Sequence, residues 1–280
     1  MVNFTVIGAN GYVGKSFCKK YEREHELIKV SRRDINCPYH LELEKPEEFK
    51  YELIPLDSIV IFTSAISSPE ICEKKKKFAT KINLEGTSYF INELINRGNK
   101  VLFFSSDTVY GERLDSVDEK SLCFPFGEYA KMKYQIESNF LKYDNFRIAR
   151  LSYVYSRYDN FTKYLINCSK NEIHAEIYSS FVRSFIYLND LLEGIYNLCS
   201  SWDLFDHKII NFGGSKSYSR IEYAKIIKKS WLNNLLIREI PAPENFFQFR
   251  PKNIKMHSPK LPIILGRKQF TIDKVFNTNL

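Results

Sequence analysis

Short apolar runs alternate with longer amphipathic segments over the first 155 residues of the chain. Each run is rich in β-branched and aromatic residues and has the length of a buried β-strand. The expected strands span residues 3–7, 27–30, 41–43, 57–62, 100–104 and 146–151. Because segments long enough for helices separate these strands, the pattern predicts a parallel sheet that is covered by helices on both faces.

The segments between the strands predict helices at about residues 12–24, 70–97 and 129–142. Gly98 and Asn99 follow the second of these segments and are typical of the end of a helix. The fold class that this order predicts is α/β, with a Rossmann-type doubly wound parallel sheet.

The regular alternation ends after residue 155, where the chain becomes more polar and aromatic. Helices are expected at about 161–170, 191–199 and 219–236, and a strand at 208–212. Asn189 and Asp190 precede the second of these helices and are predicted to cap it. We therefore expect residues 1–155 plus about 183–215 to form the Rossmann domain. A smaller C-terminal substrate-binding lobe would comprise about 156–182 plus 216–280.

The composition is compatible with one or two lobes, since 44% of the 280 residues are hydrophobic. No apolar run approaches the roughly 20 residues of a membrane span, and the first residues lack the features of a secretory signal. Six cysteines and five histidines are scattered without metal-ligand spacing. These features predict reduced thiols in the cytoplasm, no metal site and no membrane partner.

The net charge of +8 raises the possibility of nucleic-acid binding. The basic residues, however, are spread along the chain, and the one dense run, residues 74–77, is more typical of a solvated helix face. We therefore expect no nucleic-acid partner and favour small anionic ligands such as phosphates.

The turn after the first strand has the pattern GxxGxxG and leads directly into a helix. Glycines in this position allow the backbone to approach a pyrophosphate, and the helix N-terminus supplies N–H donors. The alternative is a tight turn with a purely structural role. The predicted cofactor-binding residues of this turn are Gly8, Asn10, Gly11, Tyr12, Val13 and Gly14.

The second strand ends in Ser31, Arg32 and Arg33, where an acidic residue would bind the ribose 2′-hydroxyl of NAD. Arginine suits a 2′-phosphate instead, so the sequence favours NADP(H) over NAD(H). The alternative is that both arginines point to solvent. Farther along, Glu42 is placed near the adenine, and the small residues Thr63, Ser64 and Ala65 would let the backbone pass close to the cofactor.

Ser106, Tyr129 and Lys133 form a candidate proton-transfer group. Ser106 follows the strand at 100–104, while Tyr129 and Lys133 are four residues apart and share one face of a helix. A nearby ammonium would favour phenolate and lower the pKa of Tyr129 from its usual value of about 10. The alternative is an ordinary pair on a helix surface.

Seven motifs occur together in the order found in one enzyme family. They are Gly8-x-x-Gly11-x-x-Gly14, Asn83-Leu-Glu-Gly86-Thr87, the segment 105–111, Tyr129-x-x-x-Lys133, the segment 182–187, the segment 210–214 and Arg250-Pro251-Lys252-Asn253. Between Phe4 and about Gly266 the chain resembles an extended short-chain dehydrogenase/reductase of the sugar-nucleotide epimerase/dehydratase group.

The resemblance implies a role for each residue of the proton-transfer group. Tyr129 would act as acid or base at the sugar, Lys133 would bind the nicotinamide ribose, and Ser106 would polarise the reacting oxygen. Asn83 and Ser105 would contribute to the cofactor site.

The same resemblance implies a nucleotide-diphospho-sugar as substrate and a homodimer formed through the helix of Tyr129 and the long helix before it. Arg183 and Arg250 would clamp the diphosphate, because a buried diphosphate requires cations. The alternative for both arginines is structural ion pairing.

The residues around Ser106 distinguish reactions within the family. Dehydratases carry Asp-Glu after the catalytic hydroxyl, whereas this chain has Asp107 followed by Thr108. Tyr153 resembles the aromatic residue of dTDP-4-dehydrorhamnose reductase-like 4-keto sugar reductases, and all three residues are assigned to the sugar pocket. We therefore predict an NADPH-dependent 4-keto reductase of surface polysaccharide or other deoxysugar biosynthesis. The alternatives are an NAD-dependent 4-epimerase and a non-catalytic NADP-binding regulatory protein.

Overall fold

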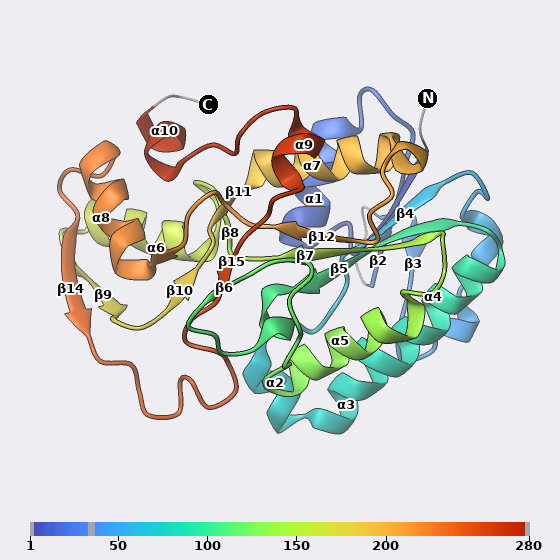
Figure 1. Cartoon of the computed structure of the whole chain (residues 1–280), viewed down its shortest axis with the longest axis horizontal. Coiled ribbons are helices and arrows are strands. Elements are labelled where there is room, and N and C mark those ends of the chain that lie inside the picture. The colour runs from blue at the N-terminus through green and yellow to red at the C-terminus, as the bar shows by residue number, and fades with distance from the viewer. Residues whose placement is uncertain (1–2, 33–36, 278–280) are drawn as a thin grey trace.

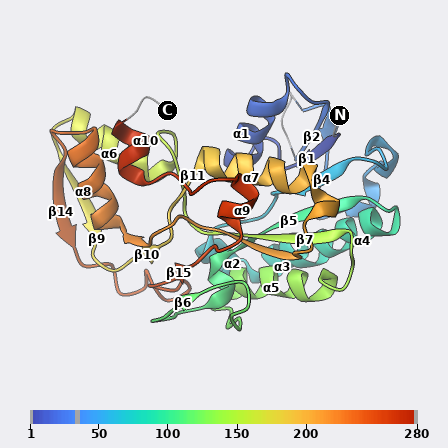
Figure 2. The same ribbon diagram turned by 45° about the horizontal axis from the view of Figure 1, so that its top comes forward.

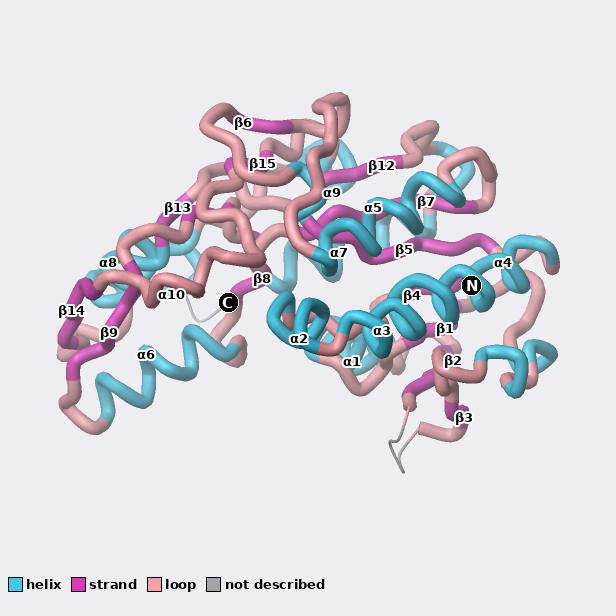
Figure 3. The backbone as a smooth tube through the Cα atoms, turned by 90° about the horizontal axis from the view of Figure 1, so that it is seen from below, coloured by secondary structure: helices cyan, strands magenta, loops and turns pink. Residues whose placement is uncertain are grey.

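The computed structural model describes residues 3–32 and 37–277 of the chain. Its centre is a sheet of seven parallel strands in the order β12-β7-β5-β4-β1-β2-β3, which can be followed in Figure 3. The strands are β1 Phe4–Ile7, β2 Leu27–Ser31, β3 Tyr39–His40, β4 Ile59–Phe62, β5 Lys100–Ser106, β7 Phe146–Leu151 and β12 Ile209–Phe212. The predicted α/β fold with a Rossmann-type parallel sheet is therefore confirmed.

Strand β1 lies in the interior of the sheet, and all four of its residues are buried. It pairs in parallel with β2 on one side and with β4 on the other, so that Phe4 is in register with both Leu27 and Ile59. Successive side chains point to opposite faces. Phe4 belongs to one apolar cluster and Ile7 to the cluster on the other face.

Helices cover both faces of the sheet (Figures 1 and 2). Helices α1, α7 and α9 lie on one face, and α2 to α5 lie on the other. Their bounds are α1 Tyr12–Tyr21, α2 Pro69–Lys74, α3 Lys76–Thr80, α4 Thr87–Asn96, α5 Glu128–Phe140, α7 Leu188–Ser200 and α9 Leu261–Leu265.

A third apolar cluster lies beside the sheet, at the carboxyl ends of its strands (Figure 1). There β9 (His174–Tyr178) and β14 (Leu236–Ile240) form a parallel pair, next to α6 (Asn160–Lys170), α8 (Arg220–Ser230) and α10 (Ile272–Asn277). The remaining short strands are β6 Ser116–Val117, β8 Val154–Tyr155, β10 Val182–Arg183, β11 Ile186–Tyr187, β13 Tyr218–Ser219 and β15 Lys255–Met256.

Several predicted elements differ in detail from the structure. The third strand lies at Tyr39–His40 instead of residues 41–43, and the helix expected over 219–236 ends at Ser230 before β14 begins. The single helix predicted over 70–97 is divided into α2, α3, a π-helical turn at Lys81–Gly86 and α4.

Close packing explains the glycine in the π-helical turn. A Cβ atom on Gly86 would lie 1.7 Å from the carbonyl oxygen of Leu43. No other residue type allows the helix to approach the segment after β3 this closely. The π-helical turn and the glycine therefore occur together at this contact.

The predicted cap at Asn189 and Asp190 is wrong. Helix α7 begins at Leu188, and Tyr187 at its N-cap position makes no side-chain capping bond. Asp190 lies inside the first turn and is fully buried, where it accepts a hydrogen bond from the backbone N–H of Phe270 at 2.7 Å. Its other oxygen lies 2.9 Å from Arg267, so it ties the C-terminal segment to α7.

Within residues 3–32 and 37–277, no helix is long and apolar enough to cross a membrane. The same residues contain no group of three or more His, Cys, Asp or Glu side chains arranged to hold a metal ion. All six cysteines are free thiols.

Candidate active site

The turn between β1 and α1 lies next to the end of β4. The strand order of the sheet changes direction between β1 and β4, and ligands of such sheets bind at this point. Gly8 has φ of +88°, and a Cβ atom there would lie 2.6 Å from the Thr63 hydroxyl oxygen. A Cβ atom on Gly14 would lie 2.3 Å from the carbonyl oxygen of Gly8. The turn therefore needs glycine at both positions, and its shape suits the pyrophosphate of a dinucleotide.

A cavity of about 360 Å³ adjoins this turn. Ten of the residues around it come from the ends of β4, β5 and β7, from α5 and from the loops beside them. The full set is Gly11, Tyr12, Val13, Thr63, Ala65, Ser67, Phe104, Ser105, Ser106, Tyr129, Lys133, Leu151, Ser152 and Val154. The structure thus brings the predicted proton-transfer group together with the glycine turn. Ser67 and Ser152 were missed because single hydroxyl residues carry no recognisable motif.

Ser106 is held in place by its neighbours. Its hydroxyl oxygen accepts hydrogen bonds from the hydroxyl of Thr108 at 2.9 Å and from the Thr108 backbone N–H at 3.2 Å. Ser106 also lines a second, larger cavity, and Thr108 lines that larger cavity beside it. Thr108 therefore orients the hydroxyl that is predicted to act on the substrate.

Lys133 lies on the same face of α5 as Tyr129 but is directed into the protein. Its ammonium donates a 2.7 Å hydrogen bond to the carbonyl oxygen of Phe104 and lies 4.4 Å from the centroid of the Phe103 ring. Burial lowers the pKa of Lys133 to about 7, which Glu137 partly opposes.

The pKa of Tyr129 departs from the sequence-based expectation. Burial raises this pKa, as do Cys72 and Asp107, and only the hydrogen bond with Ser106 lowers it. The expected lowering by Lys133 was wrong, because the ammonium is held at the carbonyl of Phe104 and is itself poorly solvated.

A cavity of about 220 Å³ lies on the other side of the glycine turn, where the adenine end of a dinucleotide would lie. Its walls are Arg32, Leu41, Leu43, Glu44, Ser64, Ala65, Ile66 and Ile82. Glu42 is exposed and does not line this cavity, whereas Glu44 does. Arg33 lies outside the described residues. Ser31 is buried beside the cavity, and Asn10 is exposed in the turn.

Asn83 supports the cofactor cavity from behind. Its side-chain oxygen accepts from the backbone N–H of Ile66 at 2.8 Å, and its amide donates to the Ile66 carbonyl at 2.9 Å. Both ends of the amide therefore position the loop after β4, and the direct contact of Asn83 with the cofactor stays a prediction.

The larger cavity has a volume of about 600 Å³ and lies between the sheet and the third apolar cluster. The predicted residues Ser106, Thr108, Tyr129, Tyr153, Arg183 and Arg250 all line it. Residues that sequence reasoning missed are Ser67, Pro69, Ser152, Tyr158, Asp159, Asn160, Lys163 and Phe181. The capping residue Asp159 could have been found as an Asp-Asn pair before a helix.

Asp107 does not line this cavity, so its predicted contact with the sugar is corrected. It is buried behind the wall, where one oxygen accepts a 2.8 Å hydrogen bond from Ser152 and lies 3.5 Å from Arg183. Burial raises the pKa of Asp107, and the Arg183 guanidinium opposes that shift most strongly.

Arg183 reaches the cavity wall with most of its donors already in use. They bind the carbonyl oxygens of Val182 at 2.7 Å, Lys252 at 3.1 Å and Pro251 at 2.8 Å. Arg250 forms an ion pair with Glu70. Both arginines therefore make structural interactions, which was the alternative to a role in binding the diphosphate.

The model of one protein family, described as the RmlD substrate binding domain, matches residues 2–268. The chain belongs to this family. None of the curated proteins compared with the chain matches it.

Solved structures with the same fold cover almost the whole chain. A hypothetical dTDP-4-dehydrorhamnose reductase from Sulfolobus tokodaii has a TM-score of 0.84 and 23% identity over 98% of this chain and 99% of its own. A dTDP-4-dehydrorhamnose reductase from Clostridium acetobutylicum has a TM-score of 0.79 and 19% identity, over 99% and 97%. A UDP-glucose-4-epimerase from Stenotrophomonas maltophila, with bound NAD and formylated UDP-arabinopyranose, has a TM-score of 0.81 and 15% identity, over 99% and 96%.

Membership of the RmlD substrate-binding-domain family confirms the resemblance to extended short-chain dehydrogenases/reductases. It also confirms the prediction of an NAD(P)-dependent enzyme of sugar-nucleotide chemistry. The glycine turn fits a dinucleotide cofactor, since a Cβ atom on Gly8 or Gly14 would collide with the Thr63 hydroxyl or the Gly8 carbonyl and prevent so tight a turn.

Proposed function

We propose that this protein catalyses the NADPH-dependent reduction of the C4 keto group of a nucleotide-diphospho-4-keto-6-deoxy sugar. One observation carries the proposal: Ser106 and Tyr129 line both the cavity beside the glycine turn and the larger cavity next to it. A carbonyl at their side chains would therefore face the cofactor on one side and leave room for the rest of the substrate on the other.

The bound nicotinamide would supply the hydride that is added to C4. Tyr129 would supply the proton to O4, which turns the ketone into an alcohol and leaves an oxidised cofactor. Because burial raises its pKa, Tyr129 is protonated at neutral pH and is ready to donate. Ser106 would donate a hydrogen bond to the same oxygen. Lys133, which lines the cavity beside the glycine turn, would bind the nicotinamide ribose.

Thr108 supports reduction over dehydration. Where a dehydratase would carry a glutamate base, its hydroxyl donates to Ser106 instead. A hydroxyl in this position orients the residue that polarises the carbonyl, but it provides no carboxylate to remove a proton for elimination.

The proposed preference for NADP(H) rests on Arg32, whose side chain lines the adenine-side cavity. We expect Arg32→Ala to lower kcat/KM with NADPH by about tenfold or more, because a guanidinium–phosphate pair is lost. The value with NADH, which lacks the 2′-phosphate, should change less than about twofold. Equal losses with both cofactors would overturn the proposed role of Arg32.

The test of the reaction is incubation with NADPH and a panel of 4-keto-6-deoxy nucleotide sugars, following the loss of reduced-nicotinamide absorbance. A 4-epimerase is the second candidate, since a UDP-glucose-4-epimerase shares the fold. It would interconvert two hydroxyl epimers with no net oxidation of cofactor. That outcome, with no turnover of any keto sugar, would rule out the reductase.

We further propose a cytoplasmic enzyme of surface polysaccharide or other deoxysugar biosynthesis, working as a homodimer through α4 and α5. Light scattering of the purified protein tests the dimer, and a monomer at micromolar concentration would contradict it. We also propose two parts of the chain: a Rossmann domain (1–155 plus about 183–215) and a substrate-binding lobe (about 156–182 plus 216–280).

A further inference from the structure

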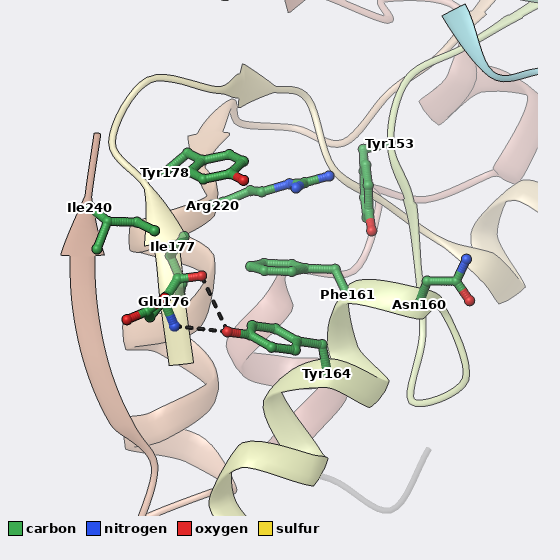
Figure 4. Close-up of a pocket in the computed structure, with 9 residues that line it drawn as sticks. All are labelled: Tyr153, Asn160, Phe161, Tyr164, Glu176, Ile177, Tyr178, Arg220 and Ile240. Carbon is green, nitrogen blue, oxygen red and sulfur yellow. Dashed lines mark hydrogen bonds between the residues drawn. The ribbon is translucent and has the colours of Figure 1, made fainter. Parts of the chain in front are cut away.

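A further cavity, with a volume of about 620 Å³, adjoins the 600 Å³ substrate cavity, and Tyr153 and Asn160 line both of them. Its remaining walls are Phe161, Tyr164, Glu176, Ile177, Tyr178, Arg220 and Ile240. Figure 4 shows Arg220 reaching into this space, with its guanidinium directed toward Tyr153 and the ring of Phe161 beneath it. A volume of this size accommodates a large part of a nucleotide.

The position of Arg220 is fixed by local structure. It is the first residue of α8, directly after Ser219, which forms a capping box with Glu222. The guanidinium carbon lies 4.8 Å from the ring centroid of Phe161 and 4.6 Å from that of Phe181. Aromatic faces stabilise the cation, but they accept none of the N–H donors that lie in the guanidinium plane.

Within the described parts of the chain, the Asp159 carboxylate stabilises the charge of Arg220 but forms no ion pair with it. Its Nε is buried without a hydrogen-bond acceptor, and no ion pair among those residues includes it. The neighbouring Asp159 already accepts from the Tyr153 hydroxyl and from backbone N–H groups at the start of α6. Glu176, which lines the same cavity, pairs with Arg238.

The ring of Phe181 connects this cation to the substrate cavity. Arg183 and Arg220 both lie over that ring, with guanidinium carbons 4.2 and 4.6 Å from its centroid. Arg183 is balanced by Asp107 at 3.5 Å, whereas Arg220 adds a second positive charge that no ion pair balances. A ligand that brings an anionic group to this junction would remove the cost of burying that charge.

We propose that Arg220 is a substrate-binding residue that contacts the phosphoryl oxygens of a nucleoside diphosphate. The planar fork of a guanidinium matches two phosphoryl oxygens, and the surrounding rings offer stacking surfaces for the attached nucleoside. The inference rests on the proposed function, since it places the glycosyl group of the same ligand at Tyr129. It shifts the main contact with the diphosphate from Arg183, whose donors are largely used by backbone carbonyls.

The test uses the full chain loaded with NADPH and compares wild type with Arg220→Gln. The matched control is Lys225→Gln, which removes one charge from the exposed side of the same helix. Calorimetry would give the Kd for UDP, dTDP and inorganic pyrophosphate, and for uridine and thymidine as phosphate-free probes. We expect Arg220→Gln to weaken the three diphosphate ligands by about tenfold to a hundredfold and the nucleosides by less than about threefold. The control should change none of them.

Two results would overturn the inference. Equal weakening of nucleosides and diphosphates would mean that Arg220 contacts the base, and unchanged binding of all ligands would mean that its role is structural. The absence of diphosphate binding to wild type would overturn it as well. If Arg220→Gln has no cooperative thermal transition, Arg220→Met is measured instead, because it keeps an apolar stem among the rings.

The proposed function fails separately. Wild-type protein that reduces no keto sugar, while its diphosphate affinity depends on Arg220, would overturn the reductase and keep the binding residue. Reduction of a keto sugar with an unchanged KM in Arg220→Gln would keep the reductase and overturn the binding role of Arg220.

Discussion

Burial acts in opposite directions on the two titratable residues of α5 that face the cofactor cavity. It raises the pKa of the Tyr129 phenol and lowers that of the Lys133 ammonium to about 7, since in both cases the charged form is poorly solvated. At neutral pH the tyrosine is therefore a proton donor, and the lysine exchanges protons close to the pH at which the enzyme would work.

Tyr129→Phe removes the proposed proton donor and leaves the cavity walls in place. We expect kcat with a keto sugar to fall by about a hundredfold to ten-thousandfold. The Kd of NADPH, measured by fluorescence titration, should stay within about threefold of wild type. Tyr134→Phe, on the same helix but outside both cavities, is the control. A kcat reduced less than tenfold in Tyr129→Phe would contradict the assignment.

Lys133→Met tests the burial of the ammonium through the pH dependence of stability. The folded pKa of about 7 lies below the ordinary value of 10.5, so the unfolded chain binds more protons between these two values. The free energy of unfolding of wild type relative to Lys133→Met should therefore rise with pH above about 7, by at most about 1.4 kcal/mol per unit. Below pH 7 the difference should become constant.

Urea unfolding at several pH values between about 6 and 9 measures this difference. Lys131→Met is the matched control, because Lys131 is exposed and pairs with Glu128 on the surface of the same helix. Curves of wild type and Lys133→Met that stay parallel over the whole range would show that Lys133 is not buried as a weak base.

Among the elements, the π-helical turn at Lys81–Gly86 connects stability to cofactor binding. Gly86 packs against the carbonyl of Leu43, and Leu43 and Ile82 both line the adenine-side cavity. Any side chain at Gly86 must push the turn and the cavity wall apart, because the atom it meets belongs to the backbone.

Gly86→Ala should lower the free energy of unfolding by about 1–3 kcal/mol, the usual cost of overpacking. It should also weaken NADPH binding, measured by fluorescence titration, because the wall of the cavity moves. Glu85→Ala changes the adjacent, exposed residue of the same turn and should alter stability by less than about 0.5 kcal/mol. Equal effects of the two substitutions would rule out the packing argument.

At the scale of the whole molecule, Asp190 links the sheet layer to the end of the chain. It is fully buried in α7 and holds both the backbone of Phe270 and the side chain of Arg267. Asp190→Ala would leave the backbone N–H of Phe270 without a partner and remove one of the two carboxylates that pair with Arg267, so we expect a loss of about 1–3 kcal/mol in the free energy of unfolding.

The neighbouring Asn189 is the control for this prediction, since sequence reasoning treated the two residues alike. Its exposed amide donates to the Tyr187 hydroxyl at 3.0 Å, and Asn189→Ala should cost less than about 0.5 kcal/mol. Guanidinium unfolding of both variants decides the matter. Losses of similar size would mean that a helix cap, rather than the C-terminal contact, stabilises this region.

The sequence was sufficient for the features that depend on local pattern. Strands such as Phe146–Leu151 were predicted with their observed bounds, and Ser106, Tyr129 and Lys133 were brought together by the parallel order of the strands. Pairing between distant segments was not predictable, because partners of buried charges have no local signal. Arg183 binds carbonyls 68 and 69 residues away. Arg220 was missed although its capping box is readable in the sequence.

The order in which the strands enter the sheet has a consequence for the synthesis of the protein. The chain leaves the sheet after β7, builds α6 and β9 beside it and α7 on one of its faces, and returns only at β12, where Ile209 pairs with Ile148. The edge of β7 therefore stays open while about sixty further residues emerge from the ribosome. Pairing of such distant strands is slow, and an open parallel edge invites association with other chains. Production of this protein should be most vulnerable to aggregation during that interval, before β12 is available to close the sheet.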